Sequence, residues 1–422
     1  MTDKSKSKHI PSIKGTKDIL PDEVRKWQNA ESAAKKIFES YGYREIRTPV
    51  FEATELFEKG TGETSDIVIK EMYTFTDKGG RSLTLRPEYT PSVVRTIIEN
   101  RLNLKPQPMR FYFMGPMFRY DKPQKGRYRQ FHQIDIEVFG EEDPAIDAEI
   151  VQMADSFLKN LKVEDTKIIV NSVGCKKCRP AYLKKLRTSA ENEKSKFCGN
   201  CKRKITTNPL RIFDCKVEAC RHTVKNFPKI TESLCEECGI HFRDFCSFLD
   251  LFGITYVIDP LLVRGIDYYT RTTFEIVTSS LGAQDAILGG GRYDEMMKDF
   301  GGPNICGIGF AMGMERLLDI APFEEDKQEF VYVAYLGEKA KSAGMKMARL
   351  IREGGREALI EYRERSLKNQ LARANKLEAS WVVIVGEDEV KSGKFQLKNM
   401  KSGKQIEDVE ENILKVIGDN KF

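Results

Sequence analysis

Apolar residues recur at helical spacing between positions 22 and 40, which predicts an amphipathic helix that stops at Gly42. The same spacing predicts further helices over residues 91–100 and 143–160. These helices stand in separate runs from the strand-like segments of the chain. The pattern therefore indicates an α+β unit in the first three quarters of the sequence.

Aromatic and branched residues gather in short segments, which predict strands at 109–120, 131–140, 256–258, 272–277 and 305–310. The polar stretch between the first two predicts a long hairpin loop, and loops of this kind often carry function. Strands that follow one another in this way favour an antiparallel sheet.

An acidic stretch that contains proline, residues 322–328, predicts a linker. Beyond it the pattern changes, because strand-like and helix-like segments alternate at 331–335, up to Ile351, 358–360, 366–376 and 381–385. This alternation predicts a small α/β domain over residues 331–422, with a mixed or parallel sheet.

Composition is that of a soluble globular protein, with 40% hydrophobic and 31% charged residues. No apolar run is long enough to span a membrane, and the first ten residues lack the apolar stretch of a secretory signal, so they are expected to form a flexible tail. No membrane partner is expected.

Positive charge is concentrated in two segments. Residues 171–255 hold 17 Lys and Arg against 9 Asp and Glu, and residues 331–422 hold 18 against 14. Two basic modules on a neutral-to-acidic body suit an enzyme that holds a nucleic acid at two places. Solvated surface charge explains the same counts equally well.

The strongest local motif begins at Phe118-Arg119-Tyr120-Asp121, continues through Gly126 to Gln133, and ends at Glu137. The guanidinium groups of its arginines can bind phosphate or carboxylate oxygens through two parallel hydrogen bonds. Gln133 and Glu137 lie four residues apart on a predicted strand, so both face the same side, with Asp135 between them. A solvated hairpin with unrelated charges is the alternative explanation.

Four other segments carry candidate chemistry. Residues 85–90 offer a carboxylate and a hydroxyl beside a proline, which suits an amino group, although simple helix capping explains them too. Residues 263–269 place an arginine and two tyrosines on a turn, and the glycines of 288–294 allow backbone to approach a ligand closely. The glycine-rich segment 307–316 has the spacing G-x-G-x-x-x-G, which is not a dinucleotide fingerprint.

These segments, in this order, resemble the signature regions of class II aminoacyl-tRNA synthetases. Residues 42–52 resemble motif 1, 118–137 resemble motif 2, and 307–316 resemble motif 3. Three more segments resemble those specific to the histidyl-tRNA synthetase family: Lys14-Gly15-Thr16-Lys17-Asp18-Ile19-Leu20-Pro21, Arg264-Gly265-Ile266-Asp267-Tyr268-Tyr269 and Gly289-Gly290-Gly291-Arg292-Tyr293-Asp294. The resemblance covers nearly the whole chain.

The resemblance implies a class II catalytic domain on an antiparallel sheet, formed by residues 1–170 and 256–325. It implies a basic, Cys-rich insertion at 171–255, leaning on the acceptor arm of tRNA, and an α/β anticodon-binding domain at 331–422. It further implies a cytoplasmic homodimer that uses L-histidine, tRNA(His), and ATP with Mg²⁺.

Roles in ATP binding follow from the same resemblance. Arg119 is expected to clamp the α-phosphate and the histidine carboxylate, and Arg264 to act as the catalytic cation. Arg127 is expected at the β- and γ-phosphates, and Arg316 at the far end of a bent ATP. Asp121 stands where the family more often has Glu, which is expected to alter contacts near the adenine.

Roles in histidine binding follow in the same way. Glu88, Thr90 and Gln133 are expected to receive the α-amino group. Glu137, Tyr268 and Tyr269 are expected to recognise the imidazole ring. Tyr89 stands where Gly is commoner in the family, so it is expected to narrow the amino-acid pocket.

Nine of the ten cysteines lie between Cys175 and Cys246. A first structural zinc site is expected from two C-x₂-C pairs 19 residues apart, namely Cys175, Cys178, Cys198 and Cys201. A second is expected from Cys215, Cys220, Cys235 and Cys238, with His222 and His241 as possible substitutes. Reduced thiols without metal are the alternative, and disulfides are disfavoured in a reducing compartment.

Two rival functions share part of this pattern. A synthetase-like regulatory subunit of ATP phosphoribosyltransferase would keep the fold without aminoacylating, but the set of Arg119, Arg264 and Arg316 and the C-terminal domain argue against it. A zinc protein that binds nucleic acid without catalysis would explain the insertion alone.

Overall fold

The computed structural model describes residues 10–62, 65–124, 126–282, 285–323 and 329–419. The chain forms two compact units, Met1–Phe323 and Glu324–Phe422. The tail expected over the first ten residues lies outside the described residues except for its last position. Positions 324–328 of the expected linker lie outside them as well.

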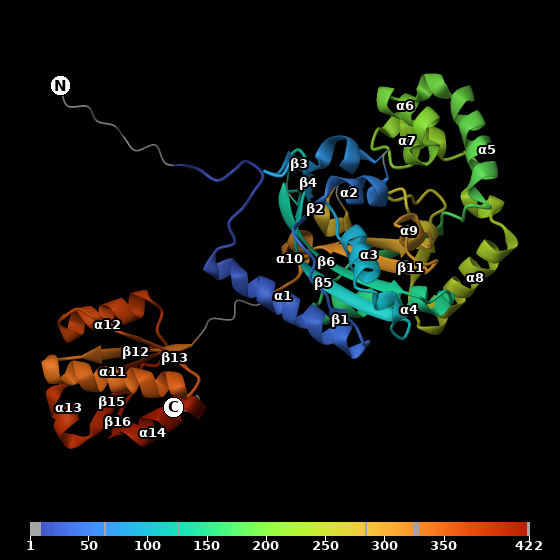
Figure 1. Ribbon diagram of the computed structural model, residues 1–422. Helices are drawn as coiled ribbons and strands as arrows, with labels where there is room; N and C mark the ends of the chain where they lie inside the picture. The colour runs from blue at the N-terminus through green and yellow to red at the C-terminus, as the bar shows by residue number, and fades with distance from the viewer. Residues whose placement is uncertain (1–9, 63–64, 125, 283–284, 324–328, 420–422) are drawn as a thin grey trace, which may run out of the picture. The chain divides into compact units, whose positions relative to one another are not determined.

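An eight-stranded sheet forms the centre of the first unit (Figure 1). Its strands run in the order β1 (Arg44–Glu45), β5 (Met109–Phe118), β6 (Gln130–Phe139), β11 (Gly307–Gly313), β10 (Ala286–Arg292), β9 (Thr270–Thr278), β7 (Thr166–Ser172) and β8 (Tyr256–Ile258). The outermost pair at each edge is parallel, and the remaining pairs are antiparallel. The α+β prediction on an antiparallel sheet is confirmed.

Helices cover both faces of this sheet. One face carries α1 (Pro21–Ser40), α4 (Pro144–Asn160), α8 (Glu236–Leu251) and α10 (Met314–Ile320), whose apolar residues share one core with the strands. The other face carries α3 (Thr90–Glu99) and α9 (Met296–Asp299). Beside α3 lie α2 (Thr54–Thr61) and a small sheet of β2 (Phe51–Ala53), β4 (Ser82–Leu85) and β3 (Tyr73–Thr76).

Local sequence explains where the main helices begin and end. α1 begins with proline at its first position and has Asp22 and Glu23 in its first turn, where carboxylates favour the helix dipole. It ends at Gly42, whose φ of +82° suits glycine. α4 begins where the Asp143 carboxylate accepts the backbone N–H of Ala145 at 2.8 Å.

Side chains of the central strands alternate between an apolar and a polar face. In β6, Ile134, Ile136 and Val138 join the core under α1 and α4. Their neighbours Gln133, Asp135 and Glu137 are buried on the opposite face. Adjacent β11 places Ile308, Phe310 and Met312 in the same apolar core, and glycines at 307, 309 and 313 on the polar side. The expected shared face of Gln133 and Glu137 is confirmed.

Residues 175–238, named here the Cys-rich module, form a helical layer with its own small core (Figure 1). It contains α5 (Arg179–Asn192), α6 (Gly199–Thr207), α7 (Glu218–Val224) and the short turn η4 (Pro209–Ile212). The following helix α8 places Phe245 and Leu249 in the core of the central sheet. The last part of the expected range 171–255 therefore packs with the central sheet.

The second unit is a three-layer α/β domain. Its mixed sheet has the order β13 (Glu357–Ile360), β12 (Phe330–Tyr335), β14 (Trp381–Val385), β15 (Lys394–Asn399) and β16 (Gln405–Val409). One face packs on α11 (Glu338–Glu353) and α14 (Glu410–Asp419), the other on α12 (Leu367–Lys376), and α13 (Glu387–Ser392) precedes β15. The first three strands are parallel and the last two antiparallel, which confirms the expected mixed sheet.

Phe38 provides a test of how the apolar face holds the first unit together. The centroid of its ring lies 5.8 Å from that of Tyr112, 5.7 Å from that of Phe157 and 6.4 Å from that of Phe310. We expect Phe38→Ala to lower the free energy of unfolding by about 3–5 kcal/mol, because it opens a cavity between these rings. Urea unfolding followed by circular dichroism measures the loss. Phe252→Ala, at a position 42% exposed, is the control, and an equal loss there would contradict this account of the core.

Candidate active site and metal centres

A pocket of about 290 Å³ opens on the polar face of the central sheet. It is bounded by β6, β10 and β11, the loop between β5 and β6, and the segments around residues 88 and 268. Nearly all the expected site residues line it, namely Glu88, Tyr89, Thr90, Arg119, Asp121, Arg127, Gln133, Arg264, Tyr268, Tyr269 and Arg316. Segments far apart in the chain thus meet at one place, as the motifs predict.

Glu137 is the one expected residue that lies behind the pocket wall. Its carboxylate is 3% exposed and accepts the hydroxyls of Thr90 and Tyr293, both of which line the pocket. Burial raises its pKa well above the usual range. Glu137 therefore holds the hydroxyls of two residues that line the pocket.

Two further carboxylates stand in the pocket wall near Glu137. Glu88 accepts the hydroxyls of Thr61 and of Tyr268, the latter at 3.0 Å, and burial raises its pKa. Asp135 is buried and lines the pocket, and neither of its oxygens has a hydrogen-bond partner among the described residues. Burial raises the pKa of Asp135 well above its usual range. This end of the pocket offers acceptors that lack donors.

Three tyrosines pack against these carboxylates. The rings of Tyr268 and Tyr269 lie 4.9 Å apart, and Tyr268 meets Tyr293 edge-on at 5.6 Å. Burial raises the pKa of Tyr269 to about 12, so its hydroxyl stays protonated at neutral pH. The wall therefore combines flat apolar surface with hydroxyl groups, which fits a small aromatic heterocycle.

Arginines gather at the other end of the pocket. The Arg119 guanidinium donates from Nε to the carbonyl of Pro87 at 2.8 Å and lies over the ring of Phe131. Arg316 donates from Nη1 to the carbonyl of Ala286 at 2.8 Å. Burial, followed by repulsion from Arg127, Arg119 and Arg264, lowers the pKa of Arg316. Such a concentration of positive charge stabilises a polyphosphate.

Arg264 occupies a position that depends on glycine. Its guanidinium forms an ion pair with Glu275 and lies directly above Gly289. A Cβ at position 289 would lie 2.1 Å from the Arg264 Cζ atom, which is too close for any contact. The glycine-rich segment of β10 therefore creates the space that this cation fills.

The two residues that depart from the family pattern, Tyr89 and Asp121, both contact neighbouring residues. Tyr89 is 2% exposed, stacks on Phe113 at 3.6 Å and donates its hydroxyl to the carbonyl of Ile46 at 2.8 Å. Most of its bulk therefore fills core space beside the pocket. Asp121 pairs with Arg127 at 2.9 Å, so it orients the arginine of the loop between β5 and β6.

Several residues of the pocket wall were not singled out from the sequence, namely Glu71, Arg211, Asp214, Tyr293 and Glu315. Asp135 could have been added, because strand alternation already placed it between Gln133 and Glu137. Glu71, Arg211 and Asp214 come from separate elements and carry no local signal. Tyr293 and Glu315 lay in motifs that were noted for their glycines.

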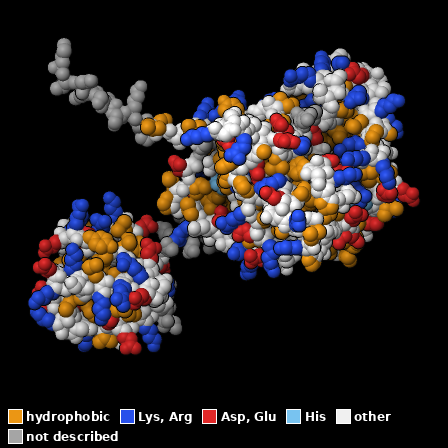
Figure 2. All heavy atoms as spheres, in the orientation of Figure 1, with side chains coloured by type: hydrophobic (Ala, Val, Ile, Leu, Met, Phe, Trp, Pro, Cys, Tyr) orange, Lys and Arg blue, Asp and Glu red, His pale blue; other side chains and the backbone are white. Residues whose placement is uncertain are grey.

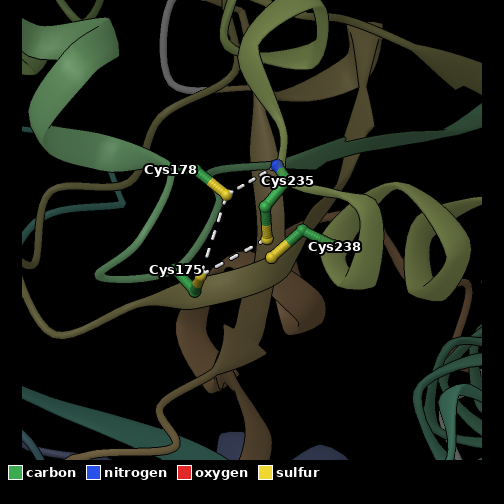
Figure 3. A group of neighbouring side chains, drawn as sticks. All are labelled: Cys175, Cys178, Cys235 and Cys238. Atoms are coloured by element: carbon green, nitrogen blue, oxygen red, sulfur yellow. Dashed lines mark hydrogen bonds between the residues drawn. The ribbon is translucent and has the colours of Figure 1, made fainter.

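The cysteines form two quartets, but their grouping differs from the expected one. The first site contains Cys175, Cys178, Cys235 and Cys238 (Figure 3), and the second contains Cys198, Cys201, Cys215 and Cys220. The expected sets, which took the cysteines in sequence order, are wrong. The pairs nest instead, because the chain leaves the body near residue 175 and returns near 235, while the inner pairs meet within the module. His222 and His241 belong to neither quartet.

Both quartets fit a tetrahedral metal. Sulfurs around Zn²⁺ with bonds of about 2.3 Å lie about 3.8 Å apart. The Cys175 Sγ atom lies 3.7 Å from that of Cys178 and 3.8 Å from that of Cys235, and the Cys198 and Cys215 Sγ atoms lie 3.9 Å apart. A disulfide would need about 2.05 Å. All ten cysteines are free thiols.

Backbone N–H groups point at these sulfurs. Cys235 donates to the Cys178 Sγ atom at 3.0 Å, and Cys198 donates to the Cys220 Sγ atom at 3.2 Å. A hydrogen bond from the Cys201 N–H is the main cause that lowers the pKa of Cys198 to about 7. Donors of this kind stabilise thiolates, which are the form that binds metal.

Comparison with known proteins agrees with this geometry. A family model described as histidyl-tRNA synthetase matches residues 15–197 and 213–317, and one described as anticodon binding domain matches 330–419. The histidine–tRNA ligases of Halothermothrix orenii and Desulforamulus reducens are each 48% identical, over 96% and 93% of this chain and 98% and 95% of theirs. The apo histidyl-tRNA synthetase of S. aureus is 33% identical, with a TM-score of 0.82 over 97% of this chain and 100% of its own.

The antiparallel sheet with its two-ended pocket, joined to an anticodon-binding domain, defines a class II aminoacyl-tRNA synthetase. Within that class, the chain belongs to the histidyl-tRNA synthetase family.

The regulatory-subunit alternative is not favoured. A structure from Bacillus halodurans described as an ATP phosphoribosyltransferase regulatory subunit/histidyl-tRNA synthetase has a TM-score of 0.64 over 88% of this chain and 97% of its own. It is only 19% identical, so this likeness shows the shared fold alone. The full-length relatives at higher identity are ligases.

No helix among the described residues has the length and apolar character that a membrane span needs.

The contact between Arg264 and Gly289 yields a direct test of the pocket. We expect Gly289→Ala to slow histidine-dependent pyrophosphate exchange about 100- to 1,000-fold, because the added methyl displaces Arg264, the cation that the family resemblance implies at the reacting phosphate. Steady-state exchange kinetics measure the effect. Gly239→Ala, where a Cβ meets nothing within 4 Å, is the control. Wild-type exchange by Gly289→Ala would contradict the assignment of Arg264.

Proposed function

We propose that this chain is a histidine–tRNA ligase that activates L-histidine with ATP and transfers it to the 3′ end of tRNA(His). The observation that carries the proposal is the polarity of the pocket, with carboxylates and tyrosines at one end and arginines at the other. An amino acid with a basic ring fits the first end, and the triphosphate of ATP fits the second. The reacting carboxylate and α-phosphate then meet between them.

At the acidic end, the α-amino group donates to Glu88, Thr90 and Gln133. Tyr268 and Tyr269 flank the imidazole ring, with Tyr89 in the wall and Glu137 orienting hydroxyls from behind. Asp135 joins this set as a further acceptor, because both its oxygens lack partners in the described structure. A site whose acceptors are otherwise unpaired rejects amino acids that lack the matching donors.

At the cationic end, Arg119 and Arg264 contact the α-phosphate, while Arg127 and Arg316 hold the outer phosphates. A carboxylate oxygen of histidine attacks the α-phosphorus, and the bond to the bridging oxygen of pyrophosphate breaks. The arginines stabilise the negative charge that develops. Mg²⁺ bound with the phosphates would neutralise further charge, and the carboxylates of Glu71 and Glu315 in the pocket wall would be its protein ligands. In the second step a terminal ribose hydroxyl of tRNA attacks the histidyl carbonyl carbon and AMP leaves.

Contacts with tRNA fall to the two basic regions. The family match at residues 330–419 supports an anticodon contact by residues 331–422. Lys and Arg side chains spread over the exposed surface of the Cys-rich module support a contact with the acceptor arm (Figure 2). We assign the working enzyme to a homodimer in the cytoplasm, on the strength of the motif 1 resemblance and of the reaction itself.

A purified chain that performs this reaction exchanges labelled pyrophosphate into ATP with L-histidine and with no other standard amino acid. A regulatory subunit or a non-catalytic nucleic-acid-binding protein gives no exchange.

Truncation after Phe323 should spare exchange and remove most tRNA charging, because every pocket residue precedes that point. Undiminished charging by the truncated chain would contradict the anticodon role of the second unit.

Both cysteine quartets are proposed to hold structural Zn²⁺, since four thiolates leave no coordination position for a substrate. We expect two ions per chain. Cys175→Ser/Cys235→Ser should retain one ion, and Cys175→Ser/Cys198→Ser should lose both, because the first pair lies in one quartet and the second pair in two. Metal analysis by mass spectrometry measures the count. The sequence-order grouping gives the reverse pattern, and Cys246→Ser, outside both quartets, should keep both ions.

A further inference from the structure

Two arginines of the Cys-rich module reach the segment that carries the tyrosine pair. The guanidinium of Arg179, directly after Cys178, donates to the backbone carbonyl of Tyr269. Arg211 donates from Nε and Nη2 to the same Asp267 carboxylate oxygen at 3.0 and 2.8 Å. Asn208 donates to that oxygen at 2.9 Å. The module therefore contacts this segment at two points.

The segment held in this way is part of the pocket wall. Asp267 is followed by Tyr268, whose hydroxyl donates to Glu88, and then by Tyr269. It lies between β8 and β9 in a stretch without helix or strand. Its position therefore depends on side-chain contacts more than on a hydrogen-bonded ladder.

Each of these two arginines lies close in the chain to a cysteine quartet. Asn208 and Arg211 lie on the stretch between Cys201 and Cys215, and both ends of that stretch belong to the inner quartet. Arg179 starts α5 immediately after a ligand of the outer quartet. Metal binding at the quartets would thus restrict where these guanidinium groups can lie.

Arg211 is 6% exposed, and the side chain of Asp267, its ion-pair partner, is 20% exposed. Removing one partner of a buried pair leaves the other charge poorly compensated, so the local chain shifts. The histidyl-tRNA synthetase family model matches residues 15–197 and 213–317, and Asn208 and Arg211 fall in the stretch it leaves out. The contact therefore joins this stretch to Asp267, which lies within the second matched range.

We propose that the Cys-rich module sets the affinity of the pocket for histidine, with Arg211 and Asn208 holding Asp267 and Arg179 holding the backbone at Tyr269. These are positioning residues, since they act through the tyrosine segment. The proposal rests on the histidine-activating function. It assigns the module a role in the first step of the reaction, before tRNA is bound.

The test is a double-mutant cycle on the full-length, metal-containing protein, with Arg211→Gln, Asp267→Asn and the double variant. In pyrophosphate exchange, Arg211→Gln should raise the KM for histidine about 10- to 100-fold and leave the KM for ATP within about twofold, because only the tyrosine end is displaced. The double variant should be no worse than either single variant, because all three lack the same contact. Arg211→Lys keeps the positive charge but lacks the planar guanidinium group. Its KM for histidine should therefore fall between those of wild type and Arg211→Gln.

Arg203→Gln is the matched control, because Arg203 is exposed on α6 and contacts Asn200 of the same helix. It should keep the wild-type KM for histidine. Metal content should remain at the wild-type value in Arg211→Gln, and calorimetric titration with histidine should show the same weakening as the KM. If Arg211→Gln does not fold, Asp267→Asn alone provides the same comparison.

Three results would overturn the proposal: an unchanged KM for histidine, an equal rise for ATP, or additive effects in the double variant. They differ from a failure of the proposed function, in which the wild-type chain itself exchanges pyrophosphate with no amino acid. An equal effect of Arg203→Gln would also overturn it, because charge in the module rather than the contact with Asp267 would then be responsible.

Discussion

Alternation of side chains across the eight-stranded sheet is the constraint on which the rest of the first unit depends. One face must be apolar to bury α1, α4 and α8, so alternate residues of β6 and β11 are committed to that core. The residues between them can then carry polar side chains or be glycines, which have no side chain. β6 uses them for Gln133, Asp135 and Glu137, while glycines of β10 and β11 leave room for the side chains of Arg264, Glu137 and Tyr293.

Charge within the pocket is divided because buried ions of one sign need partners of the other. Glu88 and Glu137 accept hydroxyls rather than guanidinium groups, and of the two only Glu88 lines the pocket. Arg119 and Arg316 donate to backbone carbonyls, at Pro87 and Ala286. Arg127 and Arg264 pair with Asp121 and Glu275. None of these four contacts uses Glu88, Asp135 or Glu137.

The Cys-rich module is connected to this pocket by its chain topology. The outer quartet closes the base of the module beside the central sheet, and the inner quartet closes a second loop within it. Such nesting brings Arg179 and Arg211 to the same short segment. A module whose basic composition predicts a contact with tRNA thus also contacts the segment of Asp267 and Tyr269 in the first unit.

Local sequence determined the elements and the chemistry of this protein. Spacing of apolar residues places α1, α4 and the β5–β6 hairpin, and the arginine and tyrosine motifs indicate most of the pocket, because these signals lie within a few residues of one another. Tertiary structure alone decided which cysteines share a metal, that Glu137 acts from behind the wall, and that Arg211 reaches Asp267. Those pairings depend on how the chain returns on itself, and spacing along a sequence contains no information about distances across the fold.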